Sequence, residues 1–123
     1  MVLIMHDSNY DLSLTLIANK NGELRRFINN PEINREEKIK VLTYIKDYLI
    51  PYRMAQARLE RGYFLWAIQS YEEKIKSYKD CYSIRRLYKA CLNDAKLQLK
   101  EVSKKLRSFR ATYDYISRKL NEI

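Results

Sequence analysis

The side chains that could act as nucleophiles or acid–base catalysts are few and scattered along the chain. The sequence has one histidine, His6, and two cysteines, Cys81 and Cys91. Nucleophilic and acid–base catalysis require such groups to be brought together, and a Cys–His pair or a Ser–His–Asp triad would have to use His6. We expect His6 to lie at a frayed terminus, with a structural or incidental role. The sequence therefore predicts a protein that is not an enzyme.

Patterns that bind phosphate or metal ions are also missing from the sequence. Gly22 and Gly62 stand alone, so there is no glycine-rich phosphate loop. Glu36-Glu37 is typical of a helix start and Glu72-Glu73 of the solvated side of a helix, and neither pair has metal-ligand spacing on an apolar face. We predict no cofactor, no metal and no small-molecule substrate.

The cysteines and the N-terminus bear on the cellular compartment. Cys81 and Cys91 have no further Cys or His nearby to complete a metal set, so we expect two reduced, partly buried thiols. The apolar residues at the start of the chain are not preceded by basic residues and are soon followed by Asp7 and Asp11. This pattern differs from that of a secretory signal peptide. No apolar run reaches the ~20 residues of a membrane span. These features predict a soluble protein of the cytoplasm or another reducing intracellular compartment.

The chemistry that the sequence does offer is electrostatic. The formal net charge is +9, and residues 83–123 hold eleven Lys or Arg against four Asp or Glu. On a heptad wheel, most of these cations fall in neighbouring columns, whereas Asp94, Glu101 and Glu122 fall in another. The predicted stripe, called the basic stripe below, consists of Arg86, Lys89, Lys96, Lys100, Lys104, Arg107, Arg110 and Arg118.

A basic stripe of this length has several possible uses. It could bind nucleic acid without sequence preference, through counterion release, or bind an acidic protein partner. It could equally be solvated, or covered by acids of a neighbouring helix, and an anionic membrane surface is a weaker alternative. The acids available for covering it are Glu60, Glu72, Glu73 and Asp80. Tyr115 lies off the apolar seam and is the tyrosine that we expect to be exposed for contacts such as base stacking.

The element that would position this stripe is one long helix from Ser83 to Ile123. From Tyr88 its apolar residues recur at alternating intervals of four and three, which is the seam of a helix that lies along another helix. The residues expected to pack there include Leu92, Leu99, Val102, Leu106, Phe109, Tyr113, Ile116 and Leu120. Neither Gly nor Pro interrupts the run.

The partner of this helix is predicted to be the segment directly before it. A second seam runs from Ile50 to Tyr78 with one fault, at Arg61. Its expected packing residues include Phe64, Ile68, Tyr71 and Ile75. Lys79 to Ser83 would connect the two helices, with Asp80 or Ser83 as cap, and so short a link makes them antiparallel. The alternative is that both segments continue as one helix.

The N-terminal third is predicted to contain shorter helices. Residues 1–30 fit either a β-hairpin turning at Asn21-Gly22 or a helix capped by Ser8 or Asp11, and we favour the helix because nothing later supplies a third strand. Asn34 is expected to cap the next helix, with Glu37 at its third position. Pro51 should close that helix or mark the first turn of the following one.

Two short stretches resemble known families. Gly62, followed by Ala67-Ile68 and Tyr71, resembles the helix-turn-helix phrase of a tetratricopeptide repeat and would make Gly62 a turn, but nothing 34 residues on repeats it. Residues 24–51 resemble the N-terminal helical domain of the ATP synthase delta/OSCP family over about thirty residues, and the C-terminal half departs from that family.

These observations predict an all-α fold: a long antiparallel, coiled-coil-like helical hairpin with one or two shorter N-terminal helices packed against it. We expect a single domain over residues 1–123, with N-terminal helices in 1–49 and the hairpin in 50–123. The predicted function is that of a non-enzymatic helical interaction protein, such as an adaptor, chaperone or structural subunit, with a protein partner or self-association. The alternative is sequence-independent nucleic-acid binding through the basic stripe.

Overall fold

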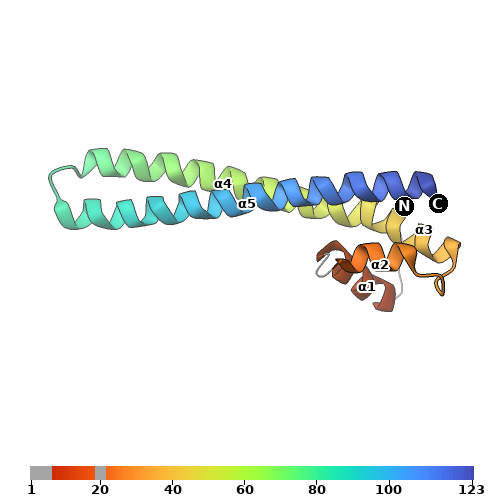
Figure 1. Cartoon of the computed structure of the whole chain (residues 1–123). Helices are drawn as coiled ribbons and strands as arrows, with labels where there is room; N and C mark the ends of the chain where they lie inside the picture. Colours follow the sequence, from red (N-terminus) through yellow and green to blue (C-terminus); the bar gives the residue numbers. More distant parts are fainter. Residues whose placement is uncertain (1–6, 19–21) are drawn as a thin grey trace. The chain divides into compact units, whose positions relative to one another are not determined.

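The computed structural model describes residues 7–18 and 22–123, and these residues form helices and no strand (Figure 1). The all-α prediction is therefore confirmed for the described chain. The helices are α1 (Asp7–Ala18), α2 (Glu23–Asn29), α3 (Arg35–Tyr44), the π-helix η2 (Ile45–Leu49), α4 (Ile50–Ser77) and α5 (Tyr82–Glu122). The chain divides into two compact units: the first contains the chain up to Arg53 together with Phe109–Ile123, and the second is Met54–Ser108.

The first unit holds the largest fully buried side chains of the described residues. They come from α1, α2, α3, η2, the start of α4 and the last part of α5, and they are Leu16, Leu24, Val41, Leu42, Ile45, Ile50 and Ile116. Burial of branched aliphatic side chains from several helices is the main stabilising term in such a core. The N-terminal helices are thus packed against the C-terminal end of α5, as the predicted architecture requires.

The N-terminal helices settle the choice between helix and β-hairpin. Gly22 adopts a left-handed conformation, with φ of 72°, as the N-cap of α2 rather than within a hairpin turn. Glycine tolerates this conformation because it has no Cβ. Our prediction of the α1 cap was wrong, since Ser8 and Asp11 both lie inside the helix.

The cap of α3 is as predicted. The Asn34 side-chain oxygen accepts a hydrogen bond from the Glu37 amide at 2.7 Å, and the Asn34 backbone is extended, with φ −71° and ψ 158°. Glu36 and Glu37 occupy the first turn, where acidic side chains interact favourably with the positive end of the helix.

Of the two alternatives predicted for Pro51, closure of the preceding helix was wrong, whereas a position in the first turn of the following helix is confirmed. Helical structure continues from Arg35 through η2 to Ser77, and Pro51 is the second residue of α4. A proline has no amide hydrogen and its ring crowds the carbonyl four residues earlier. Directly before it the chain forms a π-turn, in which the Ile50 amide donates to the Ile45 carbonyl, five residues back. The wider turn accompanies the proline without breaking the helix.

In the second unit, α4 and α5 form an antiparallel hairpin (Figure 1). The rings of Tyr78 and Tyr71 lie 6.0 and 6.2 Å from that of Tyr88, and Lys105 Nζ lies 3.9 Å from Glu60 Oε2. Residues late in α4 contact residues early in α5, and Glu60, earlier in α4, contacts Lys105, later in α5. Contacts in this order require antiparallel helices. The hairpin is confirmed, and the alternative of one continuous helix is wrong.

The hairpin turn is shorter than predicted. The Cys81 amide donates to the Tyr78 carbonyl at 3.0 Å, and α5 begins at Tyr82. Ser83 is therefore already helical, and Asp80 lies before the capping position. The prediction that one of them caps α5 was wrong. Arg85 steadies the turn from within α5 by donating from Nη1 to the Lys79 carbonyl at 3.1 Å.

Candidate interaction surfaces

The seam between α4 and α5 is only partly covered in the second unit. The buried residues there are small: Ala57, Ala67, Ala95 and Val102. The larger residues predicted to pack in the seam are half-buried, namely Phe64, Ile68, Tyr71, Ile75, Leu92, Leu99 and Leu106. The predicted positions thus face the partner helix, but two helices alone do not enclose them.

In the first unit the α5 seam meets the N-terminal helices. Ile116 is fully buried, whereas Phe109 and Leu120 are half-buried. Tyr113 departs from its predicted core role, because 36% of its surface is exposed. Lys46 of η2 places its Nζ 5.8 Å from the centroid of this ring, at cation–π distance. The Tyr113 ring is thus partly exposed and also contacts the Lys46 ammonium group.

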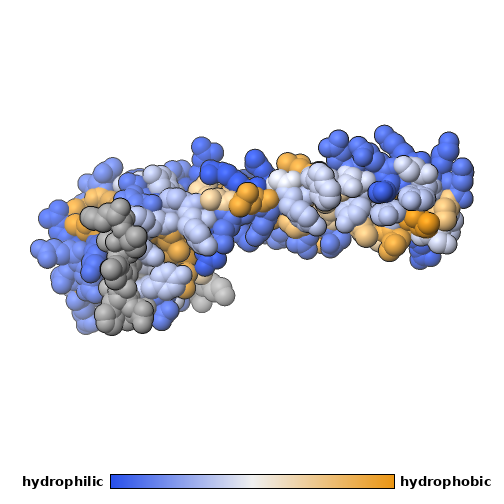
Figure 2. All heavy atoms as spheres, turned by 180° about the vertical axis from the view of Figure 1, so that it is seen from behind, coloured by the Kyte–Doolittle hydropathy of each residue, from blue (hydrophilic) through white to orange (hydrophobic). Residues whose placement is uncertain are grey.

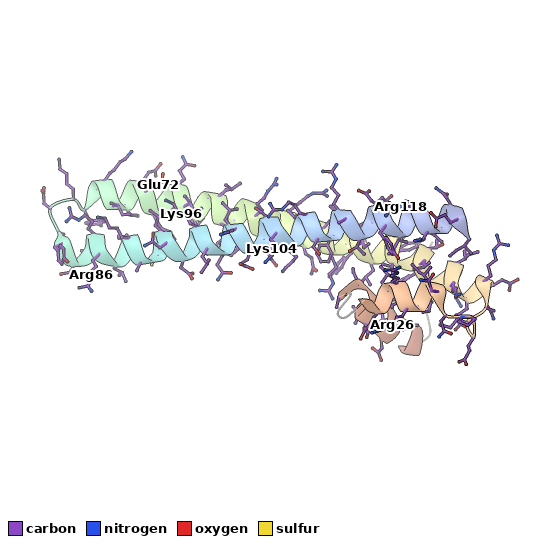
Figure 3. The ribbon with its side chains drawn as sticks, in the orientation of Figure 1. Arg26, Glu72, Arg86, Lys96, Lys104 and Arg118 are labelled. Carbon is purple, nitrogen blue, oxygen red and sulfur yellow. The ribbon has the colours of Figure 1, made fainter. Side chains whose placement is uncertain are left out.

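All eight residues of the basic stripe are exposed. Six of them, from Arg86 to Arg107, belong to the second unit, and Figure 3 marks Arg86, Lys96 and Lys104 along α5. Among residues 7–18 and 22–123, no ion pair involves a member of the stripe. The stripe is therefore available to an anionic partner.

The acids that could have covered the stripe do not do so in the described chain. Of Glu60, Glu72, Glu73 and Asp80, only Glu60 forms an ion pair, and its partner is Lys105, which is outside the stripe. Both side chains of that pair are about half exposed, at 53% and 50%, so it contributes little to stability.

Tyr115 does not have the exposure that we predicted. It is half-buried, and the Arg118 guanidinium and Lys119 ammonium lie 5.8 and 5.7 Å from its ring centroid. Well exposed aromatic rings occur instead on α4 and at the start of α5. They are Tyr52, Tyr63, Trp66 and Tyr82. Three of these four belong to α4, outside the basic helix.

A second apolar face of α4 is the feature that we did not predict. Leu59, Tyr63, Leu65 and Trp66 are exposed to 77%, 58%, 51% and 63%. Leu59 is nine residues before Ile68 of the hairpin seam, so at about 100° per residue it lies on the opposite side of the helix. On the face drawn in Figure 2, apolar residues form separate patches between hydrophilic side chains.

This face follows a heptad spacing of its own. The intervals of four and three run through Ala55, Leu59, Gly62, Trp66, Gln69 and Glu73, which we call the outer seam of α4. The spacing is present in the sequence, but the seam through Phe64 and Ile68 is the stronger apolar pattern in this segment. Alanine, glycine and two polar residues also make the outer seam less conspicuous in a hydropathy pattern.

A groove runs beside the hairpin seam in the second unit. Its volume is about 340 Å³ and its lining includes the small residues Ala67, Ala90 and Ala95 together with Tyr63 and Tyr71. Small residues allow another side chain or helix to approach the backbone closely. The groove adjoins the outer seam at Tyr63, which lines the groove and directly follows Gly62 of the seam.

Cys81 and Cys91 are free and half-buried, as predicted. Residues 7–18 and 22–123 contain no cluster of three His, Cys, Asp or Glu side chains with metal-binding geometry. His6 lies outside the described residues.

Within the described residues, no helix combines the length and apolar character needed to cross a bilayer. Gly62 lies in the interior of α4, so the tetratricopeptide-like stretch does not form the turn that its resemblance implied. No protein-family model, curated protein or solved structure matches this chain.

Proposed function

We propose that this chain is a non-enzymatic helical interaction protein, acting as an adaptor, chaperone or structural subunit whose hairpin is completed by a partner helix. One observation carries the proposal. In the second unit the buried residues are three alanines and one valine, whereas leucines, three tyrosines and the single tryptophan are exposed. An isolated pair of helices gains little from such an arrangement, because its largest apolar side chains remain in water.

The exposed side chains could supply substantial binding energy. Full burial of a large apolar side chain contributes roughly 1.5–3 kcal/mol. Leu59, Leu65 and Trp66 on α4, with Leu87 and Leu97 on α5, are all more than half exposed. Their combined burial would be comparable with the estimated 4–15 kcal/mol that association loses in rigid-body freedom. Leu59 and Leu97 each lie on the side of their helix away from the hairpin seam, so burial of the whole set would require contacts on both outer sides of the hairpin.

Dye binding and tryptophan quenching test the proposal. Trp66 is the only tryptophan, so its acrylamide quenching reports on this face alone. At the lowest measurable protein concentration we expect strong quenching and enhanced fluorescence of the apolar dye ANS. The double variant Leu59→Gln, Leu65→Gln should reduce the dye signal without reducing helicity. A dilute, folded monomer that neither binds ANS nor exposes Trp66 to quenching would refute the proposal.

A second candidate function is sequence-independent nucleic-acid binding. It is favoured by the exposure of all eight stripe cations and by the absence of ion pairs to them within the described residues. Each phosphate neutralised on a duplex contributes about −0.9 to the slope of log affinity against log salt. Engagement of the six cations in the second unit therefore predicts a slope of up to about −5.

A pair of variants with equal charge change tests the second candidate. Lys100→Glu with Lys104→Glu reverses two stripe residues, and Lys74→Glu with Lys76→Glu reverses two exposed lysines of α4. The stripe variant should weaken binding of a labelled duplex and lower its salt slope by about 2, whereas the control should change both less. Reversal of Lys96 and Arg107 as well should abolish binding with helicity intact. Equal effects of the two double variants would exclude the stripe as a specific surface.

A further inference from the structure

We propose that the partner helix is α4 of a second copy of this chain, and that the two outer seams pack against each other in antiparallel orientation. This inference rests on the proposed function, because it names the partner of the same exposed face. A symmetric pair of hairpins would place four helices together and would cover Leu59, Tyr63, Leu65 and Trp66 of both copies at once.

The spacing of the outer seam is that of a packed helix. Ala55, Leu59, Gly62, Trp66, Gln69 and Glu73 keep the intervals of four and three across five steps. Residues so spaced stay on one line when two helices wind around each other. Within the described second unit the other helix, α5, occupies the opposite side of α4, where Phe64 and Ile68 are half-buried. The outer seam therefore serves a contact that the hairpin itself does not make.

Gly62 is the residue that points to a close helix contact. Glycine is among the least favourable residues in a helix interior, yet Gly62 lies near the middle of α4. A Cβ added at this position would meet no atom within 4 Å, so packing inside the chain does not require glycine. A neighbouring helix that approaches this point would require it, because bulk on one helix needs a gap on the other.

An antiparallel register makes the outer seam complementary to itself. If the two helices cross at residue 64, seam residue i of one copy meets seam residue 128 − i of the other. Trp66 then packs over Gly62 of the second copy, and the reciprocal contact forms by symmetry. Leu59 faces Gln69 of the second copy. A parallel pair would instead place Trp66 against Trp66 and Gly62 against Gly62, so that crowded and empty layers alternate.

The flanking residues fit the same register. The residues just before Leu59, Trp66 and Glu73 form a column that flanks the seam. In an antiparallel pair this column meets its own copy, in layers offset from those of the seam, so that the numbers of facing residues sum to 130. Arg58 then meets Glu72 of the second copy, and Leu65 meets Leu65 at the two-fold axis. Both Arg58 and Glu72 are exposed, and neither has an ion pair within the described residues. Two symmetric ion pairs at the ends of the contact would favour this alignment over a parallel one.

The area available matches a specific interface. The exposed parts of two aromatic and two leucine side chains per copy amount to roughly 1,000 Å² for the pair, near the lower bound of stable interfaces. An isologous contact of this kind is also the commonest symmetry among soluble homo-oligomers. We therefore expect a dimer whose dissociation is observable at experimentally accessible concentrations.

Sedimentation equilibrium of the full chain, measured across concentrations, tests for the dimer. We expect reversible dimerisation, with a dissociation constant at least tenfold higher for Leu59→Lys or Trp66→Lys. The matched control is Leu97→Lys, an exposed leucine of α5 outside the outer seam, which should leave the constant unchanged. Equal weakening by all three variants would overturn the assignment of the interface to α4.

Cysteine cross-linking tests orientation and register. In a background with Cys81→Ser and Cys91→Ser, the variant Leu65→Cys should form a disulfide-linked dimer under mild oxidation. Leu59→Cys should not cross-link alone but should do so when combined with Gln69→Cys. A parallel dimer would reverse this outcome, because Leu59→Cys alone would then cross-link, and the proposal would be overturned.

A charge exchange provides an independent check of the register. Arg58→Glu and Glu72→Arg should each weaken the dimer, and the double variant should restore its affinity. If the chain is monomeric at every concentration but exposes Trp66 and binds ANS, the second copy is excluded and a different partner is required by the proposed function. If it is monomeric and does neither, both proposals fail.

Discussion

The substitution Gly62→Ala should change the stability of the hairpin and its association in opposite directions. In the structure Gly62 is helical and exposed, and a Cβ at this position meets nothing within 4 Å. Alanine therefore adds no clash within the chain. It removes backbone freedom from the unfolded state and favours the helix, a difference of about 0.8–1 kcal/mol in helix interiors. We expect the dissociated chain to be more stable by about that amount.

Urea unfolding followed by far-UV circular dichroism measures this effect. With a slope of about 1–3 kcal/mol per molar urea for a small protein, the midpoint should rise by roughly 0.3–1 M. The experiment requires concentrations at which the molar mass is that of the monomer. In the same variant the added methyl group enters the space assigned to Trp66 of the second copy, so the dimer dissociation constant should rise.

The direction in which Gly62→Ala shifts the urea midpoint tests whether the surroundings of Gly62 are open. A lower urea midpoint at unchanged slope would refute the open environment seen around Gly62. A higher midpoint with unchanged dimer affinity would leave the helix argument intact but would remove the close contact at this residue. Gly22→Ala is a useful contrast, because Gly22 has φ of 72° and alanine there should destabilise α2.

Two further substitutions test the core and the cap of the first unit. Ile116→Ala removes a fully buried side chain that packs with the N-terminal helices, and it should lower the free energy of unfolding by about 2–5 kcal/mol, measured by thermal or urea unfolding. Asn34→Ala removes the acceptor of the Glu37 amide and should destabilise by about 1 kcal/mol, with Asn34→Asp retaining most of the stability.

The controls for these two predictions differ. For the core, Asp114→Ala lies two residues away on an exposed face and should change stability by less than about 0.5 kcal/mol. If Ile116→Ala were as mild, the first unit could not be packed as described. For the cap, equal stability of the alanine and aspartate variants would show that the side-chain hydrogen bond contributes nothing measurable.

The features predicted correctly from sequence are those whose causes are local. The Asn34 cap needs only Asn34 and Glu37, three residues apart. Helix formation in α4 and α5 follows from an apolar spacing repeated over many turns, and the short link at Lys79 makes the two helices antiparallel. The exposure of the basic stripe follows from the heptad pattern of α5, because cations on the side of the helix away from the apolar seam face water.

Errors arose where several weak local signals competed. Closure of a helix at Pro51 was one of two alternatives, yet helical structure continues through the π-turn and Pro51 lies in the first turn of α4. Ser8, Asp11 and Ser83 are common cap residues, but each is also compatible with a helical interior, and α1 and α5 include them. Sequence alone does not rank these alternatives, since their energies differ by about 1 kcal/mol.

By itself, the sequence determined an all-α chain, an antiparallel hairpin and a basic face on its last helix, because periodicity and charge segregation are properties of single helices. Only the tertiary structure decided how much of each apolar face is covered. Tyr113 is more exposed than its seam position predicted, and Tyr115 is half-buried beneath Arg118 and Lys119. Burial depends on what lies opposite a side chain, and that is set by packing between segments far apart in the chain. The exposure of the α4 outer seam became evident for the same reason.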